Sequence, residues 1–217
     1  MKKLSALMLC LLMLLTLAPM ASAQNEDVTG KVVIYTSMYQ DIIDMMDAAL
    51  AEEFPNCDVE FFYGGTGTLQ TKLAGEMETG VLGCDMMLVA EPAYSLELKE
   101  GGWLHQYITE QAANLRFEYD EEGYWYPVRV CSMGLAYNPD MYAYEDIPTT
   151  FYDFAYDTSA AGMISMSNPL TSGTAMATIV GLQDKYGDEY FDALGGQDVM
   201  IESGSSALAK LETGECK

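Results

Sequence analysis

Short apolar runs alternate with longer amphipathic stretches in the first hundred residues. Residues 32–35, 59–62 and 86–89 resemble strands that are buried on both faces of a parallel sheet. Apolar side chains recur at helical spacing over residues 40–54, and Pro55 ends that predicted helix. Strand, helix, strand, helix, strand is typical of a parallel sheet with right-handed crossovers. The sequence therefore predicts an α/β fold.

A glycine-rich turn joins the second predicted strand to the helix that follows it. Residues 63–68 are Tyr-Gly-Gly-Thr-Gly-Thr. Glycine lets another molecule approach the backbone closely, and Thr66 or Thr68 is suited to cap the helix. The unpaired N–H groups of a first helical turn favour an anion. Thr66, Gly67 and Thr68 are therefore candidate anion-binding residues, although a capped tight turn without a ligand explains the same pattern.

Two similar turns follow predicted strands in the C-terminal half. Ser172, Gly173 and Thr174 lie at the start of a predicted helix and offer hydroxyl and backbone donors to one small anion. Ser203 stands at the start of another helix, after the strand predicted at residues 199–202. Ligands of parallel sheets bind beyond the carboxyl ends of the strands. Several such turns therefore predict a cleft that is lined by donors from two lobes.

The middle of the chain changes character. Residues 103–122 are irregular, and residues 124–130 and 133–137 are predicted to be extended and to cross between two lobes. We also expect the sequence to be a fragment, because the second lobe has no closing strand before Lys217. The predicted organisation is a signal peptide over residues 1–23, a first α/β lobe with its crossing strand over residues 24–133, and an incomplete second α/β lobe over residues 134–217.

The N-terminus is typical of a secretory signal peptide. Two lysines precede an apolar run over residues 4–17, and Ala-Ser-Ala at residues 21–23 fits the pattern that signal peptidase cleaves. The run is short for a membrane span. We therefore expect export to the periplasm or the cell exterior, with a mature chain that starts at Gln24 and lacks Cys10.

Charge and motifs exclude several function classes. A net charge of −23 argues against nucleic acid as a partner, because phosphate backbones require basic patches. His105 is the only histidine, and no HExxH, GxSxG or Walker A pattern occurs. The sequence thus predicts a protein that is not an enzyme. A surface adhesion module is a further alternative, but the repeats that favour it are absent from the sequence.

Four cysteines remain after the predicted signal peptide. They are Cys57, Cys84, Cys131 and Cys216, and no CxxC pair occurs among them. Zinc and thioredoxin-type sites therefore have no support. Export permits disulfides, and the pairing of these cysteines stays open.

The order of motifs along the chain resembles the solute-binding proteins of bacterial ABC importers. These motifs are VVIYTSMYQD, FFYGGTGTLQTKL, CDMMLVAEPAY, GLAYNPDMY, NPLTSGTAMA and SGSSALAKLETGE. The closest branch looks like the ferric-iron-binding proteins and their phosphonate-binding relatives. The resemblance runs from about residue 31 to residue 217. It implies a two-lobed periplasmic-binding-protein type II fold that closes on a ligand, here truncated in or after the second lobe.

The resemblance also implies a set of ligand-binding residues. Ferric binders place a histidine after the first strand, where this chain has Tyr39, and a glutamate after the third strand, which Glu91 matches. The turn at residues 172–174 matches the Ser-Gly turn that holds a synergistic anion, and Ser203 matches a polar residue that touches it. The tyrosine pair of that family would lie beyond residue 217. Fe(III) suits phenolate and carboxylate oxygens, so Tyr39 and Glu91 are candidate metal ligands.

Each of these two residues also has a structural interpretation. Tyr39 would pack at a turn like many other tyrosines, and Glu91 would interact with the dipole of a helix that begins next to it. The function implied is capture of ferric iron with a synergistic anion for an ABC importer. The alternative is a small oxyanion, such as a phosphonate or phosphate ester, without metal. The implied partners are this solute and a membrane permease. The resemblance also implies a monomer without a cofactor, which carries Fe(III) only as its transported ligand.

Overall fold

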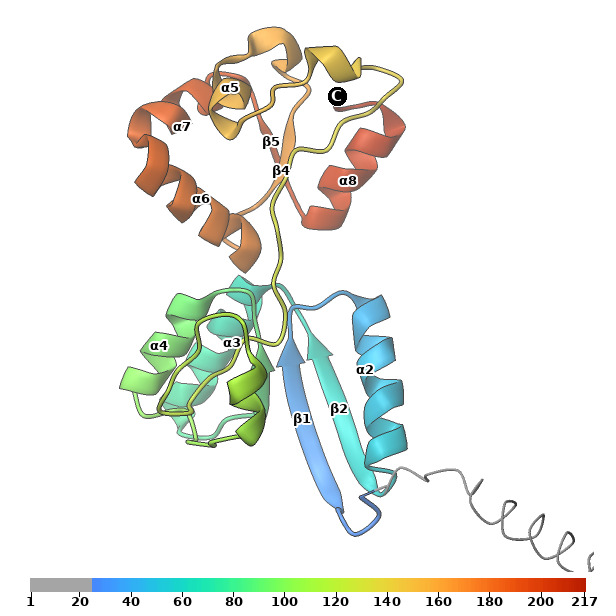
Figure 1. Ribbon diagram of the computed structural model, residues 1–217, viewed down its shortest axis with the longest axis vertical. Coiled ribbons are helices and arrows are strands. Elements are labelled where there is room, and N and C mark those ends of the chain that lie inside the picture. Colours follow the sequence, from blue (N-terminus) through green and yellow to red (C-terminus); the bar gives the residue numbers. More distant parts are fainter. Residues whose placement is uncertain (1–24) are drawn as a thin grey trace, which may run out of the picture.

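The computed structural model describes residues 25–217 as two lobes, which an irregular crossing segment joins (Figure 1). The predicted signal peptide, its cleavage site before Gln24 and Cys10 lie outside the described residues. Within the described range, no helix combines the length and the apolar character that crossing a membrane requires.

The first lobe contains a parallel sheet of three strands. They are β1 (Gly30–Thr36), β2 (Cys57–Tyr63) and β3 (Met86–Leu88), in the order β2-β1-β3. Ile34 in the central strand lies opposite Phe61 on one side and Met86 on the other. The three strands predicted from apolar runs are confirmed, and so is the α/β class.

Helices follow each strand of this sheet. They are α2 (Gln40–Glu53), α3 (Thr66–Thr79) and α4 (Pro92–Glu100). Pro92 occupies the first helical position of α4, where a missing N–H costs no intrahelical hydrogen bond. Leu73 of α3 packs against Tyr94 and Leu98 of α4, and these residues form a hydrophobic core of the first lobe.

A polar network fastens α3 to the central strand. The Tyr35 hydroxyl donates a hydrogen bond of 2.7 Å to the Glu76 carboxylate, and Lys72 forms an ion pair of 2.7 Å with the same group. The Gly83 N–H also donates to this carboxylate, at 2.8 Å. Burial raises the pKa of Glu76, but the hydrogen bonds from Lys72, Gly83 and Tyr35 outweigh burial, and the net pKa lies below its ordinary value.

The crossing segment is irregular. The segments predicted to be extended, residues 124–130 and 133–137, form no paired strand within the described range. A segment without a partner strand cannot form the hydrogen bonds of a sheet, even where its side chains favour a strand. Arg129 lines a cavity of the first lobe and Met133 lines one of the second, so the chain crosses between these two residues. The lobe boundary that we propose at residues 133 and 134 follows directly after this crossing.

The second lobe has a smaller parallel sheet, β4 (Ser165–Ser167) and β5 (Met200–Glu202). Its helices are α5 (Phe151–Tyr156), α6 (Gly173–Tyr186), α7 (Asp188–Gly195) and α8 (Gly204–Thr213). Short 3-10 turns of this lobe occur at Tyr144–Asp146 and Thr158–Ala160, and another, Glu110–Asn114, precedes the crossing. Helix α7 has no counterpart in the sequence prediction. Ala155, Tyr190 and Leu194 form the core between α5 and α7.

Candidate ligand-binding site

Several helices begin at the gap between the lobes. Figure 1 shows the strand arrows of β1 and β2 pointing toward this gap, with α2 beginning beside it, and α6 and α8 reaching down to it from the other lobe. This arrangement follows from the parallel sheets, because each helix begins where its preceding strand ends. The predicted site residues therefore lie at helix starts that face one another across the gap.

The starts of α3 and α6 touch directly. The Gly67 N–H donates a hydrogen bond of 3.3 Å to the Thr171 carbonyl oxygen in the other lobe. Gly173, at the first position of α6, lies against the side chain of Thr66, which is only 2% exposed. Thr66, Gly67 and Gly173 are thus brought together across the gap, and the Gly67 N–H already has a protein acceptor.

The starts of α2 and α8 also approach each other. Tyr39 precedes α2 and its side chain is 57% exposed. A Cβ atom placed on Gly204, at the start of α8, would lie 3.3 Å from the Tyr39 hydroxyl oxygen and 3.3 Å from the Ser167 hydroxyl oxygen. A phenol, a serine hydroxyl and a helix start therefore converge at this point.

Serine side chains cap both helices of the second lobe at this gap. The Ser172 hydroxyl accepts the Ala175 N–H at 3.3 Å, and the Ser203 hydroxyl accepts the Ser206 N–H at 3.2 Å. A hydroxyl that accepts one hydrogen bond can also donate its own proton, and the Ser203 hydroxyl lies within hydrogen-bond distance of the Ser205 and Ser206 hydroxyls, at 3.3 and 2.8 Å. Thr174 is half-buried in the same first turn of α6, and its carbonyl accepts the Thr178 hydroxyl.

The predicted threonine cap of α3 is wrong. Gly65 is the N-cap residue and makes no side-chain capping bond. Thr66 is already helical, its side chain faces Gly173, and its hydroxyl accepts the Ala90 N–H at 3.5 Å. Thr68 lies on the exposed side of the helix. The contact with the other lobe, which local sequence does not encode, decides the position of the Thr66 hydroxyl.

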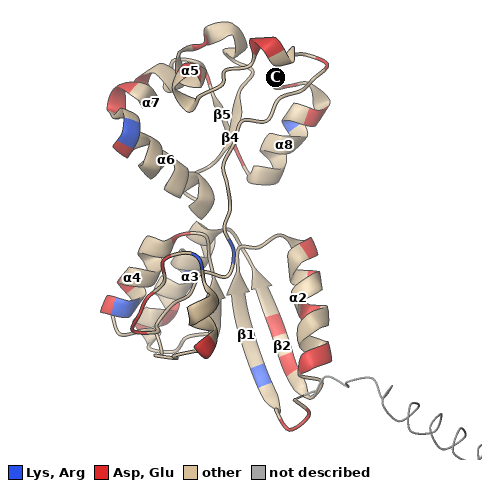
Figure 2. Ribbon diagram, viewed as in Figure 1, with Lys and Arg blue, Asp and Glu red and all other residues tan. Residues whose placement is uncertain are grey.

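The two candidate metal ligands come from different helix starts. Glu91 precedes α4, and its carboxylate accepts a hydrogen bond of 2.8 Å from the Gln70 side chain of α3. Tyr39 instead faces the start of α8. Residues 25–217 contain no group of three His, Cys, Asp or Glu side chains placed to hold a metal ion. Acidic positions are spread over both lobes (Figure 2).

Three residues of this gap were not predicted from the sequence. Gly65, Thr171 and Ser167 contact or approach residues of the opposite lobe or of a neighbouring helix. A glycine or threonine at a turn carries no local signal of a partner that is distant in the sequence. The repeated Gly-Thr and Ser-Gly turns were the available signal, and they indicated a shared edge without indicating a direct contact.

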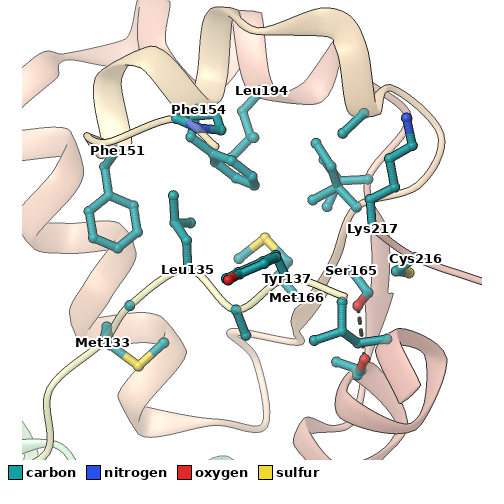
Figure 3. Close-up of a pocket in the computed structure, with 18 of the residues that line it drawn as sticks. Met133, Leu135, Tyr137, Phe151, Phe154, Ser165, Met166, Leu194, Cys216 and Lys217 are labelled. Atoms are coloured by element: carbon teal, nitrogen blue, oxygen red, sulfur yellow. Dashed lines mark hydrogen bonds between the residues drawn. The ribbon is translucent and has the colours of Figure 1, made fainter. Parts of the chain in front are cut away.

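A separate apolar cavity of about 370 Å³ lies inside the second lobe. Figure 3 shows Leu135, Phe154 and Met166 among its lining side chains, and the Ser165 hydroxyl bonded at its side to the Ala207 carbonyl at 3.0 Å. A second cavity, of about 490 Å³, lies in the first lobe between α2 and the sheet. None of the nine predicted site residues lines either cavity. The cavity of the second lobe nevertheless borders the gap, because Ser167 and Gly204 contribute to its lining.

The described cysteines are all free. Cys57, Cys84, Cys131 and Cys216 form no disulfide with one another. Cys131 is exposed at the crossing, whereas Cys216 is buried in the second lobe. Burial raises the pKa of the Cys84 thiol to about 11.

Comparison with known proteins defines the class to which this chain belongs. Residues 36–216 match the family of bacterial extracellular solute-binding proteins. The chain belongs to this family, and the two-lobed fold that the resemblance implied is confirmed. The comparison with curated proteins found no match.

Solved structures of periplasmic binding proteins share this fold. AfuA from Actinobacillus pleuropneumoniae, with bound fructose-6-phosphate, is 19% identical with a TM-score of 0.71, over 87% of this chain and 62% of AfuA. Iron-bound HitA from Pseudomonas aeruginosa is 19% identical with a TM-score of 0.67, over 86% of this chain and 61% of HitA. The periplasmic binding protein P5PA is 20% identical with a TM-score of 0.65, over 87% of this chain and 62% of P5PA.

The chain therefore spans about 60% of the length of the solved structures that it matches. At these identities the likeness establishes the fold. The identity of the solute has to be inferred from the geometry of the gap.

Proposed function

We propose that this protein is the solute-binding component of an ABC importer and that it captures a small oxyanion between its lobes, either alone or together with Fe(III). The observation that carries this proposal is the meeting of hydroxyl-bearing helix starts from both lobes. Tyr39 lies at the start of α2, and Ser172 and Ser203 cap the helices opposite. Helix starts and hydroxyls stabilise an oxyanion without many basic residues, which suits a chain with 10 lysines and arginines.

The side of the gap near Tyr39 supports the proposal further. There the Tyr39 and Ser167 hydroxyls both lie close to Gly204. On the other side of the gap, the Gly67 N–H is already bonded to the Thr171 carbonyl. A phenol and a serine hydroxyl both donate to phosphate oxygens. We propose Tyr39, Ser172, Thr174 and Ser203 as the principal contacts of the solute, with Thr68 on the opposite lip. Thr66, Gly67 and Gly173, which were also predicted to bind the solute, lie instead in the contact between the lobes.

Capture of ferric iron is the specific version that the sequence resemblance favours. The phenol of Tyr39 and the carboxylate of Glu91 are hard oxygen donors of the kind Fe(III) prefers. HitA is described with iron and AfuA with fructose-6-phosphate, so structures of this fold accommodate both kinds of solute. A metal would also relieve the repulsion between an anion, Glu91 and an ionised phenol.

Calorimetry on the intact natural protein tests the proposal, with phosphate, fructose-6-phosphate and ferric citrate as probes. We expect one-to-one binding of at least one probe. Tyr39→Phe should weaken that binding about ten- to hundred-fold, because a hydrogen bond to a charged group contributes roughly 1.5–3 kcal/mol. Tyr144→Phe is the matched control, since Tyr144 is 77% exposed on a 3-10 turn of the second lobe.

A second variant distinguishes capture of ferric iron from capture of an oxyanion without metal. Glu91→Gln keeps an acceptor for Gln70 but removes the charge, so it should weaken binding of ferric citrate more than binding of phosphate. Equal loss for both probes would contradict a role in metal binding. Uptake of a neutral sugar or an amino acid alone, unaffected by Tyr39→Phe, would overturn the oxyanion proposal.

Delivery and location complete the proposed function. We propose that the protein is exported by its N-terminal segment, acts as a monomer, passes its solute to a membrane permease and catalyses no reaction. The family of extracellular solute-binding proteins supports this interpretation. Turnover of a bound probe, detected by mass spectrometry, would contradict it.

A further inference from the structure

The contact between α3 and α6 is unusually close because three glycines make it. A Cβ atom at Gly65 would lie 2.5 Å from the Thr171 carbonyl oxygen, and one at Gly67 would collide with the Leu170 carbonyl oxygen. A Cβ atom at Gly173, from the other lobe, would lie 2.7 Å from the Thr66 hydroxyl oxygen and 2.9 Å from its Cβ. Real Cβ atoms essentially never approach other atoms this closely, since non-bonded carbon atoms attract best at about 3.5–4.0 Å.

The contact is also reciprocal. Gly65 and Gly67 of the first lobe accept the backbone of the second, and Gly173 of the second lobe accepts the side chain of Thr66. The Gly67 N–H then bonds to the Thr171 carbonyl across the gap. Because Gly67 belongs to the first turn of α3, its N–H has no partner within the helix. The other lobe supplies the partner that the helix lacks.

Glycines elsewhere in the same two helices do not share this property. A Cβ atom at Gly75 in α3, or at Gly181 in α6, would meet no atom within 4 Å. The need for glycine is therefore confined to the helix starts that touch. These two positions also provide matched controls on the same helices.

We propose that Gly65, Gly67 and Gly173 form a latch that sets how closely the two lobes approach, and that this latch holds the lobes together when a solute is captured. The proposal about capture rests on the proposed function, whereas the latch itself does not. Backbone atoms and the Thr66 side chain fill this contact, so the solute is excluded from it. A methyl group on either side would keep the two helix starts apart.

Hydrogen exchange of the Gly67 amide, followed by NMR on the intact protein, tests the latch directly. We expect exchange to be slowed about five-fold or more relative to an amide without a partner, in the free or the solute-bound protein, since a net hydrogen bond has about this effect. Gly173→Ala, which changes the opposite lobe, should abolish the slowing. Gly181→Ala on the same helix should leave it intact. An unprotected Gly67 amide in both states, or protection that survives Gly173→Ala, would overturn the latch.

Calorimetry with phosphate, fructose-6-phosphate and ferric citrate tests the link to capture. Gly173→Ala and Gly67→Ala should each weaken binding about five-fold or more, whereas Gly75→Ala and Gly181→Ala should not. Unchanged affinity in the two latch variants would show that the latch plays no part in capture. If the unaltered protein binds none of the three probes, the proposed function fails, while the exchange of the Gly67 amide still decides the latch. Circular dichroism of every variant identifies a failure to fold. If Gly173→Ala does not fold, Gly67→Ala serves as the second test of the latch.

Discussion

In the first lobe β1 and β2 pair along seven residues each, whereas in the second lobe β4 and β5 pair along three. The first lobe adds a polar network in which Tyr35, Lys72 and Gly83 all bind the Glu76 carboxylate. The second lobe has a cluster of aromatic rings instead. Tyr186 and Tyr190 stack at 5.2 Å between ring centroids, and Phe191 meets Tyr190 edge-on at 5.1 Å.

The difference shows that one strand-to-helix plan permits two ways of holding a lobe together. Longer strand pairing and a charged hydrogen-bond network distinguish the first lobe, whereas a cluster of aromatic rings on α5, α6 and α7 distinguishes the second. Stability that depends on a carboxylate varies with pH, and stability that depends on buried rings depends on shape. The two lobes should therefore respond to different perturbations.

The largest expected effect is in the second lobe. Tyr190 is 1% exposed in the core between α5 and α7, so Tyr190→Ala should cost about 3–5 kcal/mol in free energy of unfolding, as for other large buried rings. Chemical denaturation measures this loss, and hydrogen exchange should place it in α5 to α7 while β1 and β2 stay protected. Tyr152→Ala, at a ring that is 48% exposed, should cost much less. If amide protection against hydrogen exchange is lost in both lobes at once, the two lobes do not respond independently and the comparison fails.

An intermediate effect is expected in the first lobe, and it should depend on pH. Glu76→Gln removes a charge that accepts three hydrogen bonds and should cost roughly 1.5–3 kcal/mol near neutral pH. The folded-state pKa of Glu76 is lowered from its ordinary value of 4.5, so its contribution is present above that value and is lost as pH falls through the folded-state pKa. Denaturation of both proteins across acidic pH should show the difference shrinking below about pH 4.5. A difference that stays constant would mean that the carboxylate charge contributes nothing.

The smallest effect concerns thiol reactivity, because it leaves the fold intact. At pH 8, Cys131 should react first with a maleimide, since it is exposed. Cys84 should react slowly, because burial raises its pKa to about 11 and the thiolate is the reactive form. Mass spectrometry of labelled peptides gives the order. In Tyr190→Ala, labelling of Cys216 in the second lobe should accelerate while that of Cys84 does not, and equal acceleration would contradict independent lobes.

Sequence alone determined the alternation of strands and helices in both lobes. Apolar runs identified β1, β2 and β3, and polar turns marked the starts of α3, α6 and α8, because strand burial and helix capping act within a few residues. Helix α7 escaped prediction. Residues 124–130 and 133–137 were predicted to be extended but lack a strand partner within the described range, because pairing depends on the surrounding sheet.

Only the tertiary structure decided how the predicted site residues are used. Thr66 looked like a helix cap, yet its side chain packs against Gly173, and the Gly67 N–H that was predicted to bind an anion bonds to Thr171. Tyr39 was a candidate from resemblance alone, and the fold places its hydroxyl near Ser167 and the start of α8. These contacts join residues far apart in the chain. Local patterns encode propensity and capping, whereas the approach of two lobes depends on how whole sheets and helices pack, and no short stretch of sequence contains that information.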